Sequence, residues 1–307
     1  MEEWIRDNLE TIGKLAGTGL CDRCLGRMYG KSGTGMTNDL RGRLMRQALS
    51  EGGVDAPADD FCPLCENVFD MMGRFAEEVA GKINTVESDN FLVGCKVEPE
   101  ILAKEKAIWD EHKLETPESM KTELNREVGK LALPLIHRAV EFKNPQVVAC
   151  VDTRFADVEL DIATIYIAGR YNKLSREIPQ TIWPCRVCHG KGCPRCGGTG
   201  KMYQTSVQEV IGDIALKMAD GAEHFFHGMG REDIDACMLG DGRPFVLEVS
   251  RPRIRDIDLD RLEMESNQSD LVKFNSLKFV PKEYVQLYKA SDPDKVYRVT
   301  VRAQDKV

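Results

Sequence analysis

The chain has 307 residues, of which 42% are hydrophobic and 30% are charged, enough for two or three globular domains. No run of about 18 or more apolar residues occurs, which excludes a membrane-spanning helix. The acidic, amphipathic start MEEWIRDNLE is unlike a signal peptide. We therefore expect a cytoplasmic protein.

The formal net charge of −8 by itself argues against nucleic-acid binding, but the charge is unevenly distributed. Residues 169–205 hold seven basic residues and a single acid, Glu177. The basic residues are Arg170, Lys173, Arg176, Arg186, Lys191, Arg195 and Lys201. This basic segment of an acidic chain is either a solvated loop or a surface that contacts RNA.

Eight of the eleven cysteines fall into four C-x-x-C pairs. The pairs are Cys21/Cys24, Cys62/Cys65, Cys185/Cys188 and Cys193/Cys196. Two such pairs make one Cys₄ zinc site, and zinc is favoured over disulfides in a reducing cytosol. We therefore predict two structural Zn²⁺ ions per chain. Cys95, Cys150 and Cys237 stand alone and are expected to be small buried apolar side chains.

Residues 1–66 are expected to form an N-terminal zinc-binding unit. The segment NDLRGRLMRQALSEGG predicts a helix with Asn38 as its N-cap, because Leu40, Leu44, Met45 and Ala48 share one face. Gly52 and Gly53 end it. Thirty-seven residues separate Cys24 from Cys62, which is long for a compact zinc knuckle.

Residues 67–168 are expected to form an α/β module of about one hundred residues. A helical stripe comes first, formed by Val68, Met72, Phe75 and Val79. The segment FLVGCKVE predicts a strand, and a charged helical stretch through ESMKTELNREVGKLALPLIHRA follows it. Residues 147–153 and 160–169 then predict two further strands.

The segments CRVCHGKG and CPRCGGTG are tandem copies of C-x-x-C-x-G-x-G with a period of eight residues. Each cysteine pair makes a turn that directs two sulfurs at one ion, and the glycines adopt backbone angles closed to other residues. Four thiolates complete the ligand set, so His189 is surplus and the metal is structural. An amphipathic helix follows, with Val207, Val210, Ile211, Ile214 and Met218 on one side.

The segment GMGREDIDACMLGDGRPFVLE, residues 228–248, places Arg231, Glu232, Asp233 and Asp235 ahead of an apolar strand. Its carboxylates could form a solvated turn, a metal site or a nucleophile. A catalytic metal is disfavoured, because only His224 and His227 are near in sequence and a glycine turn follows them. No phosphate-binding glycine motif is present. The surface turn and the nucleophile stay open. Further on, KVYRVTVRAQ alternates like a strand.

The Gly-Arg-x-Asp turn, followed by the K-x-Y motif of Lys295 and Tyr297, resembles pseudouridine synthases. The resemblance extends over AGRYNKLSREIPQTIWPC, the double cysteine repeat, SVQEVIGD and GREDIDACMLGDGRPFVLE, in this order. Together these segments resemble the archaeal-type tRNA pseudouridine synthases that act on uridines 54 and 55 of the T loop. That family carries an N-terminal zinc unit and a THUMP-containing accessory domain, which fits the first 168 residues in outline.

The resemblance implies a cofactor-free isomerisation of uridine in tRNA. Asp233 would be the catalytic carboxylate, Tyr297 would stack on the base, and Arg231 would fill the space that the everted base leaves. Zinc would take no part in the chemistry. The candidates for RNA contact are Arg170, Lys173 and Arg176, with Arg251, Arg253 and Arg255 as secondary candidates near the site.

The expected fold class is α+β. A zinc unit (1–66) precedes a THUMP-like module (67–168) and a mixed-sheet catalytic domain (169–307) that includes the second cysteine cluster. The resemblance further implies that the catalytic domain is incomplete at its C-terminus, so that a second chain could supply the rest. Two other functions stay open. One is a tRNA-binding accessory protein without chemistry. The other is a binding module like the zinc region of DnaJ-type chaperones, although that region has four repeats against two here.

Overall fold

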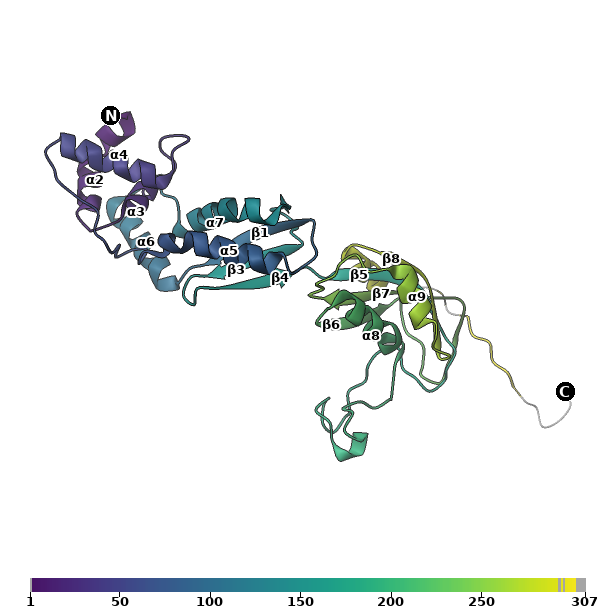
Figure 1. Cartoon of the computed structure of the whole chain (residues 1–307). Helices are drawn as coiled ribbons and strands as arrows, with labels where there is room; N and C mark the ends of the chain where they lie inside the picture. Colours follow the sequence, from purple (N-terminus) through teal and green to yellow (C-terminus); the bar gives the residue numbers. More distant parts are fainter. Residues whose placement is uncertain (1, 292–293, 295, 302–307) are drawn as a thin grey trace. The chain divides into compact units, whose positions relative to one another are not determined.

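The computed structural model describes residues 2–291, 294 and 296–301, and the chain divides into two compact units, residues 1–161 and 162–307. Figure 1 shows the first unit in purple to teal and the second in teal to yellow, and each is considered by itself. Both units combine helices with a four-stranded sheet, which confirms the predicted α+β class. In the described part of the chain, no helix is long and apolar enough to cross a membrane.

The first unit begins with four helices. They are α1 (Glu3–Asp7), α2 (Leu9–Ala16), α3 (Asp22–Arg27) and α4 (Asn38–Glu51). Helix α4 confirms the helix predicted here, although Thr37 rather than Asn38 precedes it as the N-cap and Leu40 is 40% exposed. Helices α3 and α4 touch through glycines, because a Cβ on Gly42 would lie 1.9 Å from the Asp22 carbonyl oxygen.

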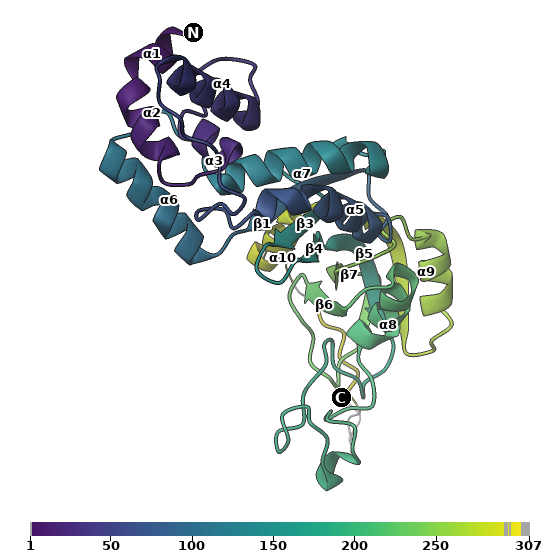
Figure 2. The same cartoon turned by 60° about the vertical axis from the view of Figure 1, so that its left-hand side comes forward.

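A sheet with the strand order β2-β1-β3-β4 forms the rest of the first unit. Its strands are β1 (Asn90–Lys96), β2 (Ala139–Val140), β3 (Val147–Asp152) and β4 (Asp157–Ile162). The helices are the 3₁₀ turn η1 (Val68–Met71), α5 (Met72–Ile83), α6 (Pro99–His112) and α7 (Met120–Ile136). Side chains of β1 and β3 alternate between buried and partly exposed, since α5 and α7 contact the sheet. Both views show α5 and α7 side by side (Figures 1 and 2).

A buried ion pair joins the helical start of the first unit to α6, the helix that follows β1 in the chain. Arg27 of α3 contacts Glu105 of α6, and both side chains are almost completely buried. A buried guanidinium needs such a partner, because an unpaired charge in the core is costly. Contacts therefore cross the predicted boundary between residues 66 and 67, and two separate domains there stay a prediction.

The strand predicted at 160–169 is in fact two strands, and this prediction was wrong. Strand β4 ends at Ile162, and β5 (Ile165–Lys173) begins in a different sheet. The exposed Ala163 and the half-exposed Thr164 separate them. Both strands are half-buried, so their apolar residues look continuous along the sequence. The division between the units therefore lies at 161/162, and the predicted boundary at 168/169 falls inside β5.

The second unit holds a sheet with the strand order β6-β7-β5-β8. Besides β5, its strands are β6 (Glu223–Gly228), β7 (Met238–Ser250) and β8 (Val272–Phe279). Its helices are the 3₁₀ turn η2 (Pro194–Cys196), α8 (Val207–Ala219), α9 (Leu259–Ser266) and α10 (Glu283–Ala290). All three described strand pairings are antiparallel, which corrects the mixed sheet expected here.

Helices α8 and α9 cover one face of this sheet, and the core lies between them. Tyr171, Phe226, Phe245 and Phe274 form an aromatic cluster in it, with the rings of Phe226 and Phe245 stacked 4.8 Å apart. Helix α8 confirms the predicted amphipathic helix. Ser206 caps it by accepting a hydrogen bond from the Glu209 N–H, and its hydroxyl donates to the Glu209 carboxylate.

The strand predicted over 295–304 does not form among the described residues of that segment, which corrects this prediction. Residues 296–301 have no regular structure, and Val296, Tyr297, Val299 and Val301 are 98%, 75%, 77% and 84% exposed. Alternation makes a strand only where a neighbouring strand accepts its hydrogen bonds, and no described strand pairs with this segment. Lys295 and residues 302–304 lie outside the described residues.

Candidate functional site

The charged loop, which we define as residues 229–237, connects β6 to β7 at one end of the sheet. Arg231, Asp233 and Asp235 are exposed, whereas the side chain of Glu232 is buried. Among the described residues, the Asp233 carboxylate has no hydrogen bond or ion pair. The Asp235 carboxylate likewise has none, so among the described residues the loop presents two exposed, unpartnered carboxylates, at residues 233 and 235, to an approaching ligand.

The neighbouring Glu232 carboxylate anchors this loop to the core. It lies 2.9 Å from Nε of Arg243 and accepts a hydrogen bond of 2.8 Å from the Tyr171 hydroxyl. Gln180 extends the network by donating to the Tyr171 oxygen and to the Gly230 carbonyl. Burial, together with the Glu232 charge, raises the pKa of Tyr171 well above its usual value, so the hydroxyl stays protonated and donates.

Lys173, the last residue of β5, lies beneath the charged loop. Its side chain is completely buried, and its ammonium donates to the carbonyls of Ile178, Asp233 and Ile234 at 3.1, 3.1 and 2.8 Å. Burial lowers the pKa of Lys173, while the nearby Glu232 charge opposes this change. Lys173 therefore has no surface to offer RNA, which corrects its prediction as a contact residue.

Arg176 contacts the charged loop, whereas Arg170 contacts β7, and both keep exposed surface. Arg170 donates to the Asp241 carbonyl at 2.7 Å, and Arg176 donates to the Asp235 carbonyl at 2.8 Å. Each guanidinium has further N–H groups beyond those bonds. The structure therefore brings Arg176 to the loop that carries Asp233, and it places Arg170 beside Asp241, four residues beyond the end of that loop.

Arg251, Arg253 and Arg255 follow the opposite end of β7. Phe245 pairs with Gly228 at the end where the charged loop begins, and Ser250 pairs with Glu223 at the other end. Five strand residues span about 17 Å. The prediction that these arginines lie near Asp233 was therefore wrong. Arg253 instead pairs with Asp220, and Arg255 donates to the Ala163 carbonyl.

The first cysteine group lies in the interior of the first unit. Cys21, Cys24, Cys62 and Cys65 direct their sulfurs at one point, all within 4.8 Å of one another. Sulfurs at the corners of a tetrahedron with Zn–S bonds of about 2.3 Å would be about 3.8 Å apart. The Sγ atoms of Cys21 and Cys65 are 3.8 Å apart, so this group fits a metal of that size. Arg27 donates to the Cys24 sulfur at 3.5 Å, which places a cation beside the thiolates.

The second cysteine group lies on an excursion between β5 and α8 and is more exposed. Cys185, Cys188, Cys193 and Cys196 again converge, with Sγ separations of 3.7 to 3.9 Å. The N–H groups of Cys193 and Gly200 both donate to the Cys196 sulfur at 3.2 Å. Against the effect of burial, these donors lower the pKa of Cys196 to about 6, which favours the thiolate that a metal needs.

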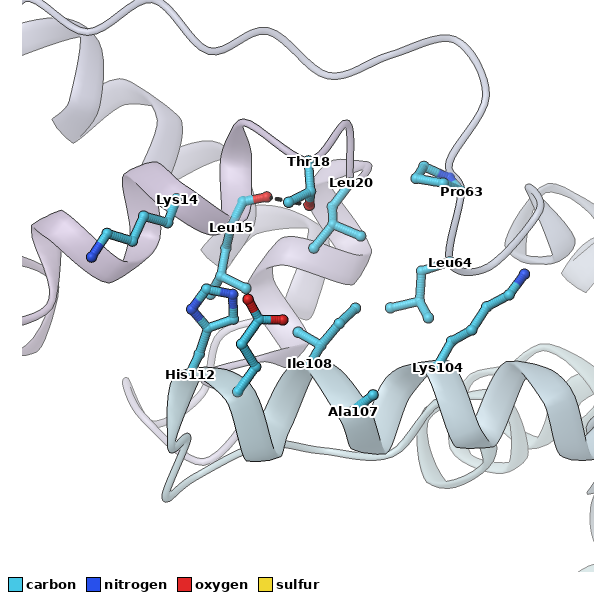
Figure 3. A pocket seen from close by; sticks show the side chains of 11 residues that line it. Lys14, Leu15, Thr18, Leu20, Pro63, Leu64, Lys104, Ala107, Ile108 and His112 are labelled. Atoms are coloured by element: carbon cyan, nitrogen blue, oxygen red, sulfur yellow. Dashed lines mark hydrogen bonds between the residues drawn. The ribbon is translucent and has the colours of Figure 1, made fainter.

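A pocket of about 530 Å³ in the first unit holds none of the predicted site residues. Figure 3 shows that it lies between α2, the segment of Pro63 and Leu64, and α6, with Ile108 pointing into it. Its walls are mostly apolar, and it adjoins the place where α6 packs beside the first cysteine group. We interpret this pocket as a gap left where these elements pack against one another, and not as a ligand site.

Sequence reasoning missed the buried support of the charged loop. The sequence gives no reason to select Tyr171, Arg243 or Gln180, and it presents Glu232 only as one of several charges ahead of a strand. One signal was available in the sequence. Lys173 lies two residues beyond Tyr171 and four beyond Gly169 on β5, so strand alternation puts it on the core face.

Known families match both units. The family described as "Pus10 THUMP domain, archaeal" matches residues 75–152, within the first unit, and "Pus10, C-terminal" matches residues 166–307, within the second. The class of protein defined here is thus a THUMP-containing chain with a second α+β unit that carries the charged loop.

Curated relatives identify the family. The chain is 39% identical to the tRNA pseudouridine synthase Pus10 of Methanothrix thermoacetophila, over 92% of this chain and 69% of the relative. It is 38% identical to that of Methanothermobacter marburgensis, over 99% of this chain and 76% of the relative. It is 41% identical to that of Methanopyrus kandleri, over 81% and 63%. The chain belongs to the Pus10 family.

Proposed function

We propose that this chain is a tRNA pseudouridine synthase that isomerises uridines in the T loop, at positions 54 and 55. The relatives named above are tRNA pseudouridine synthases by name, and the T-loop positions are our addition from the family resemblance. The observation that carries the proposal is the exposed Asp233 carboxylate, which has no partner among the described residues and lies on a loop that Glu232 anchors to the core and Arg176 contacts. Asp235 is exposed in the same way, and the Gly-Arg-x-Asp motif is what selects Asp233. Such a carboxylate is poised to meet a nucleotide that has left its stack.

The reaction needs no oxidant and no organic cofactor, because pseudouridine is an isomer of uridine. Asp233 acts on the sugar, either at its anomeric carbon or at the neighbouring proton, and the C1′–N1 bond breaks. The uracil turns, C5 bonds to C1′, and the proton lost from C5 is balanced by the one gained at N1. Tyr297, whose ring is exposed, stacks on the uracil, and Arg231 occupies the space left in the RNA.

RNA is held mainly through its phosphates. Arg176 contacts a phosphate close to Asp233, since it keeps free guanidinium N–H groups at the charged loop, and Arg170 contacts a phosphate beside β7. The THUMP-like module grips the acceptor end of the tRNA. Arg251, Arg253 and Arg255, at the other end of β7, contact phosphates farther from Asp233.

Both cysteine groups hold Zn²⁺, and the metal is structural. Four protein thiolates fill the tetrahedral ligand set, so no position is left for substrate. The cytoplasm suits such sites, because thiols stay reduced there.

The test is pseudouridine formation on an unmodified tRNA transcript. Asp233→Asn keeps the size of the side chain and should reduce turnover by about 1,000-fold or more, as expected for a lost nucleophile. Asp235→Asn is the matched control, two residues away and equally exposed, and should stay within about threefold of wild type. Turnover that survives Asp233→Asn would eliminate the proposed nucleophile. Tight tRNA binding without turnover by the wild-type chain would instead favour the accessory function.

A further inference from the structure

Lys173 is a completely buried lysine for which the reaction described above has no use. Burying an ammonium costs free energy that a methionine of similar length would not incur. No carboxylate of a described residue lies within ion-pair distance of the Lys173 Nζ atom. All three of its N–H groups instead meet main-chain carbonyls. The hydrogen bonds to those three carbonyls must therefore be what offsets the cost of burying the ammonium.

Two of these carbonyls belong to consecutive residues, Asp233 and Ile234. Successive carbonyls that converge on one cation restrict the dihedral angles of the peptide between them. The direction of the Asp233 side chain follows from those angles. The third carbonyl, that of Ile178, ties the same ammonium to the segment after β5. Lys173 thus joins the charged loop to the sheet at the residue that carries the proposed nucleophile.

Glu232 fixes the main chain on the N-terminal side of Asp233. Its buried carboxylate is fixed by Arg243 and Tyr171, immediately before Asp233 in the chain. The main chain is therefore fastened both before and after Asp233, while the Asp233 side chain stays exposed. This arrangement is typical of a preorganised catalytic group, for which a displacement of about 1 Å costs about 100-fold in rate.

We propose that Lys173 is a positioning residue, whose ammonium sets the direction of the Asp233 carboxylate by binding the carbonyls of residues 233 and 234. This inference rests on the proposed function, in which Asp233 is the nucleophile. It concerns kcat and not tRNA affinity, because Lys173 has no exposed surface with which to contact RNA.

The experiment replaces the ammonium without changing the bulk of the side chain. Lys173→Met should lower kcat by about 100-fold and leave KM and the tRNA dissociation constant within about twofold of wild type. Removal of the buried charge offsets part of the cost of leaving the three carbonyls without a donor, so the variant should fold with a lower melting temperature, and kcat is compared well below it. Lys217→Met, at an exposed position on α8, is the control and should behave as wild type.

Chemical rescue separates positioning from folding. Lys173→Ala leaves a cavity lined by the three carbonyls, and propylammonium is the fragment that was removed. Added propylammonium should raise the rate of Lys173→Ala about tenfold in a saturable manner, if the lost rate lies in position. The neutral analogue 1-propanol should not.

The outcomes distinguish this inference from the proposed function. If Asp233→Asn is inactive while Lys173→Met keeps kcat within about threefold of wild type, the positioning role is overturned and the nucleophile stands. Failure of propylammonium to rescue a folded, slow Lys173→Ala would also overturn it. If Asp233→Asn is active, the proposed function fails, and the positioning role fails with it.

Discussion

At the scale of single residues, adjacent residues of the charged loop have different roles. Asp233 is exposed and without a partner in the described chain, whereas Glu232 is buried and fully hydrogen-bonded. The sequence predicts four charges in five positions but cannot say which of them is buried. Glu232 is the buried residue because it binds Arg243 and Tyr171, which lie 11 and 61 positions away in the sequence.

Glu232→Gln should destabilise the second unit by about 2 kcal/mol, because Arg243 then stays buried without a charged partner. Denaturant unfolding monitored by circular dichroism measures this change. The control is Asp241→Asn, which removes an exposed carboxylate on β7, the strand that also carries Arg243. It should change the unfolding free energy by less than about 0.5 kcal/mol. An equal loss in the two variants would mean that the Glu232–Arg243 pair contributes nothing beyond general surface charge.

At the scale of elements, periodicity predicts helices better than it predicts strand partners. The amphipathic pattern of α8 and the stripe of α5 are confirmed, because a helix makes its hydrogen bonds within itself. Strands need a partner elsewhere in the chain. For that reason residues 160–169 were merged into one strand and residues 296–301 were assigned a strand that does not form.

The close crossing of α3 and α4 gives a prediction about helix glycines. Gly42→Ala should destabilise the first unit by more than about 3 kcal/mol, since its Cβ would lie 1.9 Å from the Asp22 carbonyl oxygen and main chain must move. Gly81→Ala on α5 meets nothing within 4 Å and should instead stabilise by about 0.5–1 kcal/mol. Thermal unfolding of the two variants checks this. A similar effect of both substitutions would contradict the close packing of α3 on α4.

At the scale of the whole molecule, the two cysteine groups differ in their setting. Cys24, Cys62 and Cys65 are 0 to 1% exposed among the helices of the first unit, with Arg27 beside them. In the second group, only Cys185 is buried. The same ligand set therefore supports a folded core in one unit and an exposed excursion in the other.

Metal removal should reflect this difference. Metal analysis should find about two zinc ions per chain, and a chelator should remove the ion of the exposed group first, with little change in helix content. Loss of the second ion should unfold the first unit, because the binding free energy of a structural zinc, on the order of 10 kcal/mol, is largely folding free energy. Cys193→Ser and Cys24→Ser form the matched pair. Equal loss of helix in these two variants would contradict the structural distinction between the groups.

The sequence by itself determined the cysteine groups, the amphipathic helices and the candidate carboxylate, because each depends on residues a few positions apart or on a motif that is complete in itself. Cys185 to Cys196 need only the spacing of their own turns to converge. The tertiary structure alone decided the support of the site. Lys173 is buried and binds the carbonyl of Ile234, 61 positions away in the sequence. Arg251 lies at the end of β7 that is far from the charged loop. Strand pairing and burial bring together segments that are far apart in the sequence. A local sequence pattern does not predict which of these segments will be in contact.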